Sequence, residues 1–133
     1  MRAAILRDDS GTLNIEDVTI DKPDRNEVLI KTVASGLCHS DLHFIDGSWS
    51  FLAMYPMLLG HEAAGVVQAV GEDVVGIQTG DHVITCLSMF CGYCERCLTG
   101  HSYLCSERQQ VQGRQPGNQP RITDNDGAEV NQF

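Results

Sequence analysis

The sequence has few basic residues and no long apolar stretch. Nine lysines and arginines stand against 18 aspartates and glutamates, which gives a net charge of −9 at pH 7 and an isoelectric point near 4.7. A surface of this sign repels phosphate backbones and anionic lipid headgroups. No apolar run approaches the roughly 18 residues that a membrane-spanning helix needs. We therefore expect neither nucleic acid nor a membrane as a partner.

The chain also lacks the pattern of a secretory leader and the length for two full domains. Its first residues become charged at Arg7 and Asp8, too soon for the apolar region of a signal peptide. We therefore expect a cytoplasmic protein. With 133 residues, of which 42% are hydrophobic and 20% charged, the chain has room for one soluble domain.

Turn residues recur at short intervals along the chain, and this spacing is typical of β-structure. Strands are predicted at residues 2–6, 13–20, 27–35, 62–70 and 82–87, and a short helix at residues 40–45. Many short strands favour a small, partly open β-barrel over alternating strands and helices. The predicted fold is therefore mainly β, with short helices.

The C-terminal part of the chain is polar. Residues 109–126 are rich in Gln, Asn, Gly, Pro and Asp, so we expect a mobile excursion or a hairpin about Asp126-Gly127, without a contribution to the core. On this interpretation residues 1–108 form the domain, and residues 109–133 lead away from it.

Six cysteines need an explanation, because a reducing compartment disfavours disulfides. Four of them form a CxxCxxCx7C array of Cys91, Cys94, Cys97 and Cys105. Four thiolates can close a tetrahedron around Zn²⁺, and gaps of two residues let tight turns point the sulfurs inward. We predict a structural zinc lobe over residues 91–105, with a reduced thiol cluster or a CxxC redox pair as the alternative. Cys86, outside the array, is predicted to be a small buried residue.

Two further segments place thiol, imidazole and carboxylate groups at the ends of apolar runs. They are Cys38-His39-Ser40-Asp41-Leu42-His43 and Gly60-His61-Glu62-Ala63-Ala64-Gly65. Their spacing alone leaves a mixed metal site and ordinary packing equally open.

Together, these motifs resemble the zinc-dependent alcohol dehydrogenases of the medium-chain dehydrogenase/reductase superfamily. The GHExxGxxxxxG signature of that family reads Gly60-His61-Glu62-Ala63-Ala64-Gly65, then five residues and Gly71. The array at residues 91–105 has the spacing of the family's structural zinc lobe, and residues 38–43 are similar to its catalytic-cysteine segment. The resemblance runs from Met1 to about Cys105. It implies a GroES-like catalytic domain, a partly open barrel that carries a zinc-knuckle lobe.

The resemblance also implies a catalytic centre. Cys38 and His61 would be two ligands of a catalytic zinc, with Glu62 orienting the site or entering the coordination sphere transiently. Ser40 would hydrogen-bond the alcohol oxygen, and His43 would pass its proton to solvent. As alternatives, Ser40 could only cap the helix and His43 could be an ordinary surface histidine.

The remaining implied roles concern the cofactor and the substrate. His39 would lie near the pyrophosphate of the cofactor, and Trp49 would line the substrate pocket, with core packing of its loop as the alternative. The implied reaction oxidises a primary or secondary alcohol to an aldehyde or ketone, by zinc-alkoxide formation and hydride transfer to NAD or NADP. Small alcohols and aldehydes are then the partners of the full-length enzyme.

Two features of that family are missing from this sequence. It contains no GxGxxG turn of a Rossmann domain and no cysteine beyond Cys105 to serve as a third ligand. We therefore expect an N-terminal part of the enzyme, as an expression fragment or a truncated gene product. Alone it should hold about one zinc and be inactive, and an apolar surface left by missing strands should promote self-association.

The alternative function is a zinc-held thiol redox switch or an interaction module without dehydrogenase activity. A co-chaperonin of the same barrel type is a third hypothesis, but it has no use for the zinc ligands.

Overall fold

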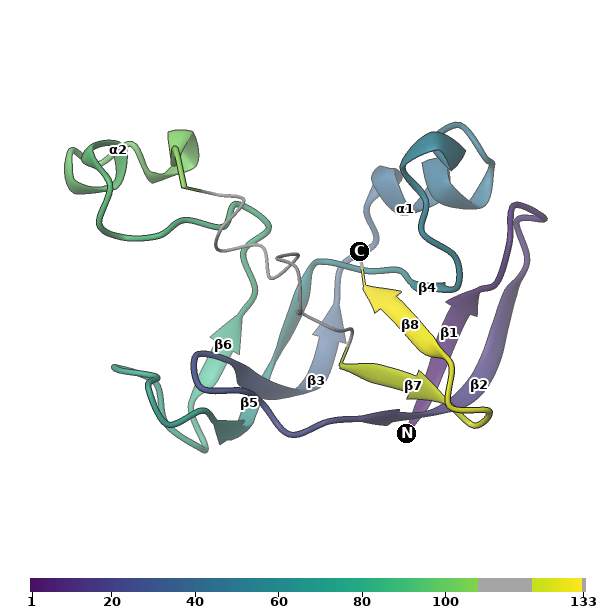
Figure 1. The fold of residues 1–133 in the computed structure, drawn as a ribbon, viewed down its shortest axis with the longest axis horizontal. Helices are drawn as coiled ribbons and strands as arrows, with labels where there is room; N and C mark the ends of the chain where they lie inside the picture. The colour runs from purple at the N-terminus through teal and green to yellow at the C-terminus, as the bar shows by residue number, and fades with distance from the viewer. Residues whose placement is uncertain (108–120, 133) are drawn as a thin grey trace. The chain divides into compact units, whose positions relative to one another are not determined.

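Five strands close into a β-barrel in the computed structural model, which describes residues 1–107 and 121–132 (Figure 1). Around the barrel they run β1 (Arg2–Leu6), β2 (Leu13–Ile20), β7 (Ile122–Asp124), β8 (Glu129–Gln132) and β4 (Met57–Leu58). Neighbouring strands are antiparallel except β4 and β8, which are parallel. The prediction of a mainly β, barrel-type fold is confirmed.

Three further strands form a separate antiparallel sheet in the order β3 (Val28–Ser35), β5 (Ala63–Val70) and β6 (His82–Ile84). The last residue of β3, Ser35, pairs with the first residue of β5, Ala63. The last residue of β6, Ile84, pairs with Ala64. The segments that follow β3, precede β5 and follow β6 therefore meet at one end of this sheet.

The chain divides into two units, of which unit 1 comprises Met1–Thr85 and Pro120–Phe133 and unit 2 comprises Cys86–Gln119. Unit 1 contains both sheets, the helix α1 (His39–Ile45) and the 3-10 turn η1 (Ser50–Leu52). Unit 2 contains the short helix α2 (Glu95–Leu98) and the 3-10 turn η2 (Ser102–Leu104). Within the described ranges, no helix has the length and apolar character needed to traverse a bilayer.

The core of unit 1 consists of two clusters. One joins Ile5, Val18, Ile122 and Val130, which are at most 3% exposed, inside the barrel. Adjacent residues of a strand point to opposite faces, so Leu6 leaves this cluster and packs with Phe44 of α1 and Met57 of β4. Phe44 therefore anchors α1 to the outside of the barrel.

The expectation that residues 109–126 contribute nothing to the core is wrong at Ile122, which is fully buried. The predicted hairpin about Asp126-Gly127 is present, and its strands β7 and β8 close the barrel. A polar composition averaged over this segment hides the few apolar side chains that point inward. The expected excursion over residues 109–120 lies outside the described residues.

A buried carboxylate stabilises this hairpin. Asp124 Oδ1 accepts hydrogen bonds from the amides of Asp126 and Ala128 at 3.0 and 2.8 Å, and Oδ2 lies 2.8 Å from the Arg7 guanidinium. Arg7 also pairs with Glu16 on β2. The hydrogen bond from Arg7 lowers the pKa of Asp124, so this carboxyl is charged at neutral pH.

The prediction that Cys86 is buried is also wrong. The strand predicted over residues 82–87 ends at Ile84, and Cys86 lies beyond it, exposed. Because Cys86 lies after the end of the strand, the alternation of strand side chains between two faces does not apply to it, and its thiol is not directed into the core.

Candidate metal centres

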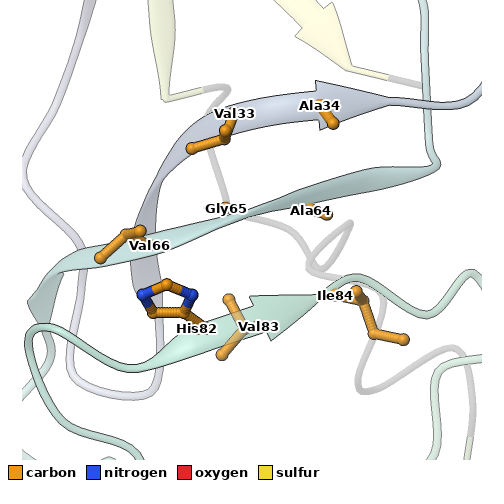
Figure 2. A pocket seen from close by; sticks show the side chains of 8 residues that line it. All are labelled: Val33, Ala34, Ala64, Gly65, Val66, His82, Val83 and Ile84. Carbon is orange, nitrogen blue, oxygen red and sulfur yellow. The ribbon is translucent and has the colours of Figure 1, made fainter.

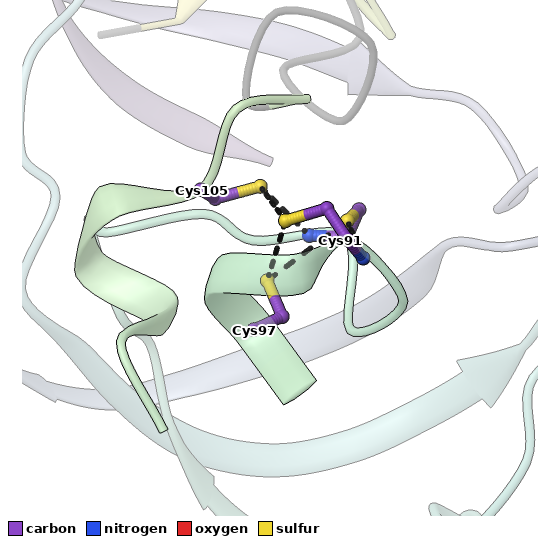
Figure 3. A group of neighbouring side chains, drawn as sticks. Cys91, Cys97 and Cys105 are labelled. Carbon is purple, nitrogen blue, oxygen red and sulfur yellow. Dashed lines mark hydrogen bonds between the residues drawn. The ribbon is translucent and has the colours of Figure 1, made fainter. Parts of the chain in front are cut away.

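The four cysteines of the CxxCxxCx7C array converge in unit 2, and Figure 3 shows Cys91, Cys97 and Cys105 of this group. Their sulfurs all lie within 4.8 Å of one another. The Sγ atoms of Cys94 and Cys97 are 3.4 Å apart, those of Cys91 and Cys97 3.9 Å, and those of Cys94 and Cys105 4.0 Å. A zinc tetrahedron with Zn–S bonds of about 2.3 Å has sulfur–sulfur edges of about 3.8 Å. The cluster therefore fits a structural zinc site.

Local structure brings these sulfurs together. Cys94 is the N-cap of α2 and Cys97 lies one turn later in that helix, so their side chains share one face. Cys105 follows η2 directly. Backbone amides also point at the sulfurs, since the Cys91 amide lies 3.4 Å from Cys105 Sγ and the Cys94 amide 3.3 Å from Cys91 Sγ. Such hydrogen bonds stabilise the negative charge of thiolates.

The thiols of this cluster differ in acidity. Hydrogen bonds from the backbone amides of Cys97 and Ser106 lower the pKa of Cys94 to about 5. Loss of solvent around the Cys97 thiol raises its pKa to about 12, and the neighbouring thiols add to this effect. Without metal, a thiolate at Cys94 therefore lies beside a protonated Cys97, and a bound cation would replace that proton.

A second group of ligand atoms occurs in unit 1. Cys38 Sγ, a ring nitrogen of His61 and a carboxylate oxygen of Glu62 lie within 4.8 Å of one another. The β3–β5 ladder explains this proximity, because the Gly36 amide continues it by donating to the Glu62 carbonyl at 2.9 Å. Cys38 follows two residues after Gly36, and His61 precedes Glu62. Thiolate, imidazole and carboxylate are all ligands that zinc accepts.

Ser40 lies between the two candidate ligands. Its hydroxyl donates to Cys38 Sγ at 3.1 Å, and its Oγ is 3.3 Å from His61 Nε2. The alternative that Ser40 caps α1 is not supported. Cys38 is the N-cap residue of this helix, and the helix N-terminus has no side-chain cap hydrogen bond. The serine hydroxyl therefore faces both candidate ligands.

Asp41 is a site residue to which the sequence analysis assigned no role. Its Oδ1 accepts the Gly60 amide at 3.0 Å and lies 3.7 Å from His61 Nδ1. Gly60 has a φ of +104°, a conformation that favours glycine, at the turn that presents His61. A carboxylate within a few residues of a candidate cysteine ligand is the signal that could have identified Asp41.

Three aromatic rings form a row along α1 and the loop after it. The ring centroids of His39 and His43 are 4.8 Å apart, as are those of His43 and Trp49. Trp49 also packs edge-on against buried Phe44, with centroids 5.6 Å apart. The structure thus brings together three of the predicted residues, His39 and His43 on α1 and Trp49 in the loop after it. It also gives Trp49 a packing role.

An open hollow of about 380 Å³ lies on the three-stranded sheet (Figure 2). Its lining includes Val33 of β3, Val66 of β5 and Ile84 of β6, and Val33 and Ile84 are 72% and 83% exposed. His82 is the titratable residue in the lining, and none of the predicted site residues takes part. The expected self-association through an exposed apolar surface stays a prediction.

Comparison with known proteins identifies a family. The model of the alcohol dehydrogenase GroES-like domain matches residues 24–127. An alcohol dehydrogenase of Moraxella sp. is 41% identical over 110 residues, which are 82% of this chain and 32% of the relative. The S-(hydroxymethyl)glutathione dehydrogenase of Saccharomyces cerevisiae is 38% identical over 112 residues, 84% of this chain and 29% of the relative. The chain therefore spans about a third of the length of these curated relatives.

Solved structures agree with this result. An alcohol dehydrogenase zinc-binding domain protein from Burkholderia ambifaria superimposes with a TM-score of 0.84 at 35% identity, over 98% of this chain and 35% of that chain. The benzyl alcohol dehydrogenase of Acinetobacter calcoaceticus superimposes with a TM-score of 0.78 at 32% identity, over 98% of this chain and 34% of that chain.

Proposed function

The chain belongs to the alcohol dehydrogenase GroES-like domain family, and from this premise we propose that it is the zinc-binding part of an enzyme that oxidises primary or secondary alcohols with NAD or NADP. The observation that carries the proposal is the convergence of Cys38, His61 and Glu62 at one end of the three-stranded sheet. A mixed ligand set of this kind is typical of catalytic zinc, whereas four thiolates are typical of structural zinc. The two clusters therefore take different roles.

Cys38 and His61 are the proposed ligands of the catalytic zinc, and Glu62 either orients them or binds in turn. When bound there, zinc supplies Lewis-acid chemistry, which lowers the pKa of a hydroxyl group. The Ser40 hydroxyl, which the Cys38 sulfur already orients at 3.1 Å, would hold the alcohol oxygen, accept its proton and give up its own proton in exchange. Ser40 is thus a catalytic residue of the proposed reaction.

His43 is the proposed exit for that proton. Its Nδ1 is buried and, among the residues that the structure describes, finds no hydrogen-bond partner. An imidazole is the side chain best suited to exchange protons near neutral pH. The rings of His39 and Trp49 on either side fix its orientation. His39 is further proposed to approach the cofactor pyrophosphate, and Trp49 to border the substrate.

A cobalt titration of the isolated chain tests the mixed site. With the four-cysteine cluster first filled by one equivalent of zinc, added Co²⁺ should bind at Cys38 and His61 and give a thiolate-to-cobalt absorption band. Cys38→Ala should abolish the band, whereas Cys86→Ala, the matched control, should leave it unchanged. A band that survives in Cys38→Ala would contradict the assignment.

The same preparation tests the expected inactivity. The 133 residues contain no GxGxxG turn, so the isolated chain should show no NAD-dependent alcohol oxidation. Measurable turnover by this chain would overturn that part of the proposal.

A thiol redox switch is the second candidate function, and the 3.4 Å separation of Cys94 and Cys97 Sγ favours it. In such a switch one hydrogen peroxide would oxidise the two thiols to a disulfide, forming two waters and releasing the zinc. Peroxide titration with a zinc indicator distinguishes the candidates. Zinc release at mild peroxide, together with changed binding of a partner, would favour the switch over a purely structural site.

A further inference from the structure

The backbone that presents His61 is held from several sides. Its neighbour Gly60 donates its amide to Asp41 of α1 at 3.0 Å. Glu62 accepts the Gly36 amide at 2.9 Å, from the side of β3. Residues 60–62 lie before the first residue of β5. The strand ladder proper therefore does not fix them, and separate hydrogen bonds do.

Thr85 supplies the hydrogen bonds from the side of β6. Its amide donates to the Ala63 carbonyl at 2.8 Å, which continues the β5–β6 ladder by one residue. Its Oγ1 accepts the Ala63 amide at 2.9 Å and lies 3.2 Å from the carbonyls of both His61 and Ala63. The hydroxyl has one proton, and the Thr85 amide already serves the Ala63 carbonyl. We therefore assign the hydroxyl proton to the hydrogen bond with the His61 carbonyl.

We propose that Thr85 is a positioning residue of the mixed metal site, whose hydroxyl bridges the His61 carbonyl and the Ala63 amide. These two groups belong to the peptide planes on either side of Glu62. Fixing both planes sets the direction in which the His61 ring and the Glu62 carboxylate face Cys38. The inference rests on the proposed function, because it assumes that these three residues bind a metal.

The opposite edge of the site shows why the direction of Glu62 needs such control. A Cβ atom at Gly36 would come within 2.0 Å of Glu62 Oε2 and 3.1 Å of Glu62 Cβ, so the glutamate side chain lies directly over Gly36. With β3 this close on one side, a small rotation of the peptide would move the carboxylate into the backbone or away from the site. Thr85 prevents that rotation from the other side.

Thr85→Val and Thr85→Ser test the inference. Valine keeps the branched shape but removes the hydroxyl, whereas serine keeps the hydroxyl. In the cobalt titration of the zinc-loaded chain, Thr85→Val should weaken binding at the mixed site about tenfold, the lower end of the effect of losing a group that orients a metal ligand. Thr85→Ser should restore the affinity. Thr19→Val, at an exposed position of β2 in the barrel, is the matched control and should bind cobalt like the unmodified chain.

Hydrogen exchange supplies a second readout. The Ala63 amide should exchange faster in Thr85→Val, because its acceptor is gone, while thermal unfolding of the barrel stays unchanged. The inference would be overturned if Thr85→Val kept the cobalt affinity and spectrum of the unmodified chain, even if its Ala63 amide exchanged faster. It would also be overturned if Thr85→Ser lost as much cobalt affinity as Thr85→Val. If the unmodified chain binds no cobalt beyond the four-cysteine cluster, the proposed function itself fails, and the positioning role with it.

Discussion

Replacing Cys97 by serine should remove the metal from unit 2 and unfold this unit, while the barrel stays folded. Cys97 Sγ contributes two of the short sulfur contacts, at 3.4 Å to Cys94 and 3.9 Å to Cys91. In the described part of unit 2, Cys105 is the only buried residue. Because no apolar core replaces the sulfur cluster there, the order of the lobe depends on the metal.

The size of the effect follows from linkage. A ligand at 100 times its dissociation constant stabilises the state that binds it by about 2.7 kcal/mol, a factor of about 100 in the equilibrium between closed and open forms. Amides of residues 91–105 should therefore exchange about a hundredfold faster in Cys97→Ser. Strands β1 and β2 contribute Ile5 and Val18 to a separate core, so their protection should persist.

Hydrogen exchange read by mass spectrometry, with elemental analysis on the same samples, measures both effects. Cys86→Ser is the matched control, since this exposed cysteine lies outside the cluster and its replacement should leave zinc content and protection unchanged. Full zinc content and an equally protected lobe in Cys97→Ser would refute the reasoning. The reasoning would also be refuted if the unmodified chain, kept reduced and supplied with excess zinc, bound no zinc.

Three other properties of the chain can be tested in the same way. In a urea titration, Ile122→Ala should lower the free energy of unfolding of unit 1 by about 3 kcal/mol, because it removes a fully buried side chain. The control Ile15→Ala, at a 59% exposed position, should lower it by under about 1 kcal/mol. Zinc binding should release the proton of Cys97, whose pKa is raised to about 12, so the zinc affinity measured by chelator competition should rise with pH by up to about tenfold per unit for that proton. The pKa of Asp124 is lowered chiefly by Arg7. The contribution of this carboxylate to stability is therefore present above its unfolded pKa of about 3.9 and is lost as the pH falls through the folded pKa. Asp124→Asn should therefore flatten the acid side of a plot of thermal midpoint against pH.

The four-cysteine site could be predicted from the sequence because it is local. All its ligands lie within residues 91–105, and two-residue gaps leave few ways to arrange the chain between them. The structure brings the four sulfurs together as the spacing indicates. No long-range pairing has to be known for this inference.

The mixed site depends on a register that the sequence does not show. Cys38 and His61 meet because Ser35 pairs with Ala63, and composition cannot fix that pairing. A slip of one residue would flip the side chains of β5 relative to those of β3 and would displace the segments that carry Cys38 and His61. From the residues alone, packing and metal binding were therefore equally open, and only the family resemblance joined the two segments.

The features that the sequence analysis missed are of two kinds. Strands β7 and β8 are short, so Ile122 and Val130 stand alone in a polar segment and produce no periodic signal. Asp41 and Thr85 act through hydrogen bonds from side chains to distant backbone groups. Propensity and periodicity describe neither kind of contact, because both depend on which segments the fold brings together.

The two candidate metal centres depend on the fold in opposite ways. In the described part of unit 2 the sulfurs occupy the place of a core, so a metal bound there would help to create the structure that binds it. Around Cys38 and His61, hydrogen bonds from Gly36, Asp41 and Thr85 hold the backbone without any metal. A metal that must accept and release substrate oxygen needs ligands whose positions do not change when its coordination changes. The mixed site would meet that requirement if it holds the proposed catalytic metal, whereas a four-thiolate structural site binds no substrate and does not need it.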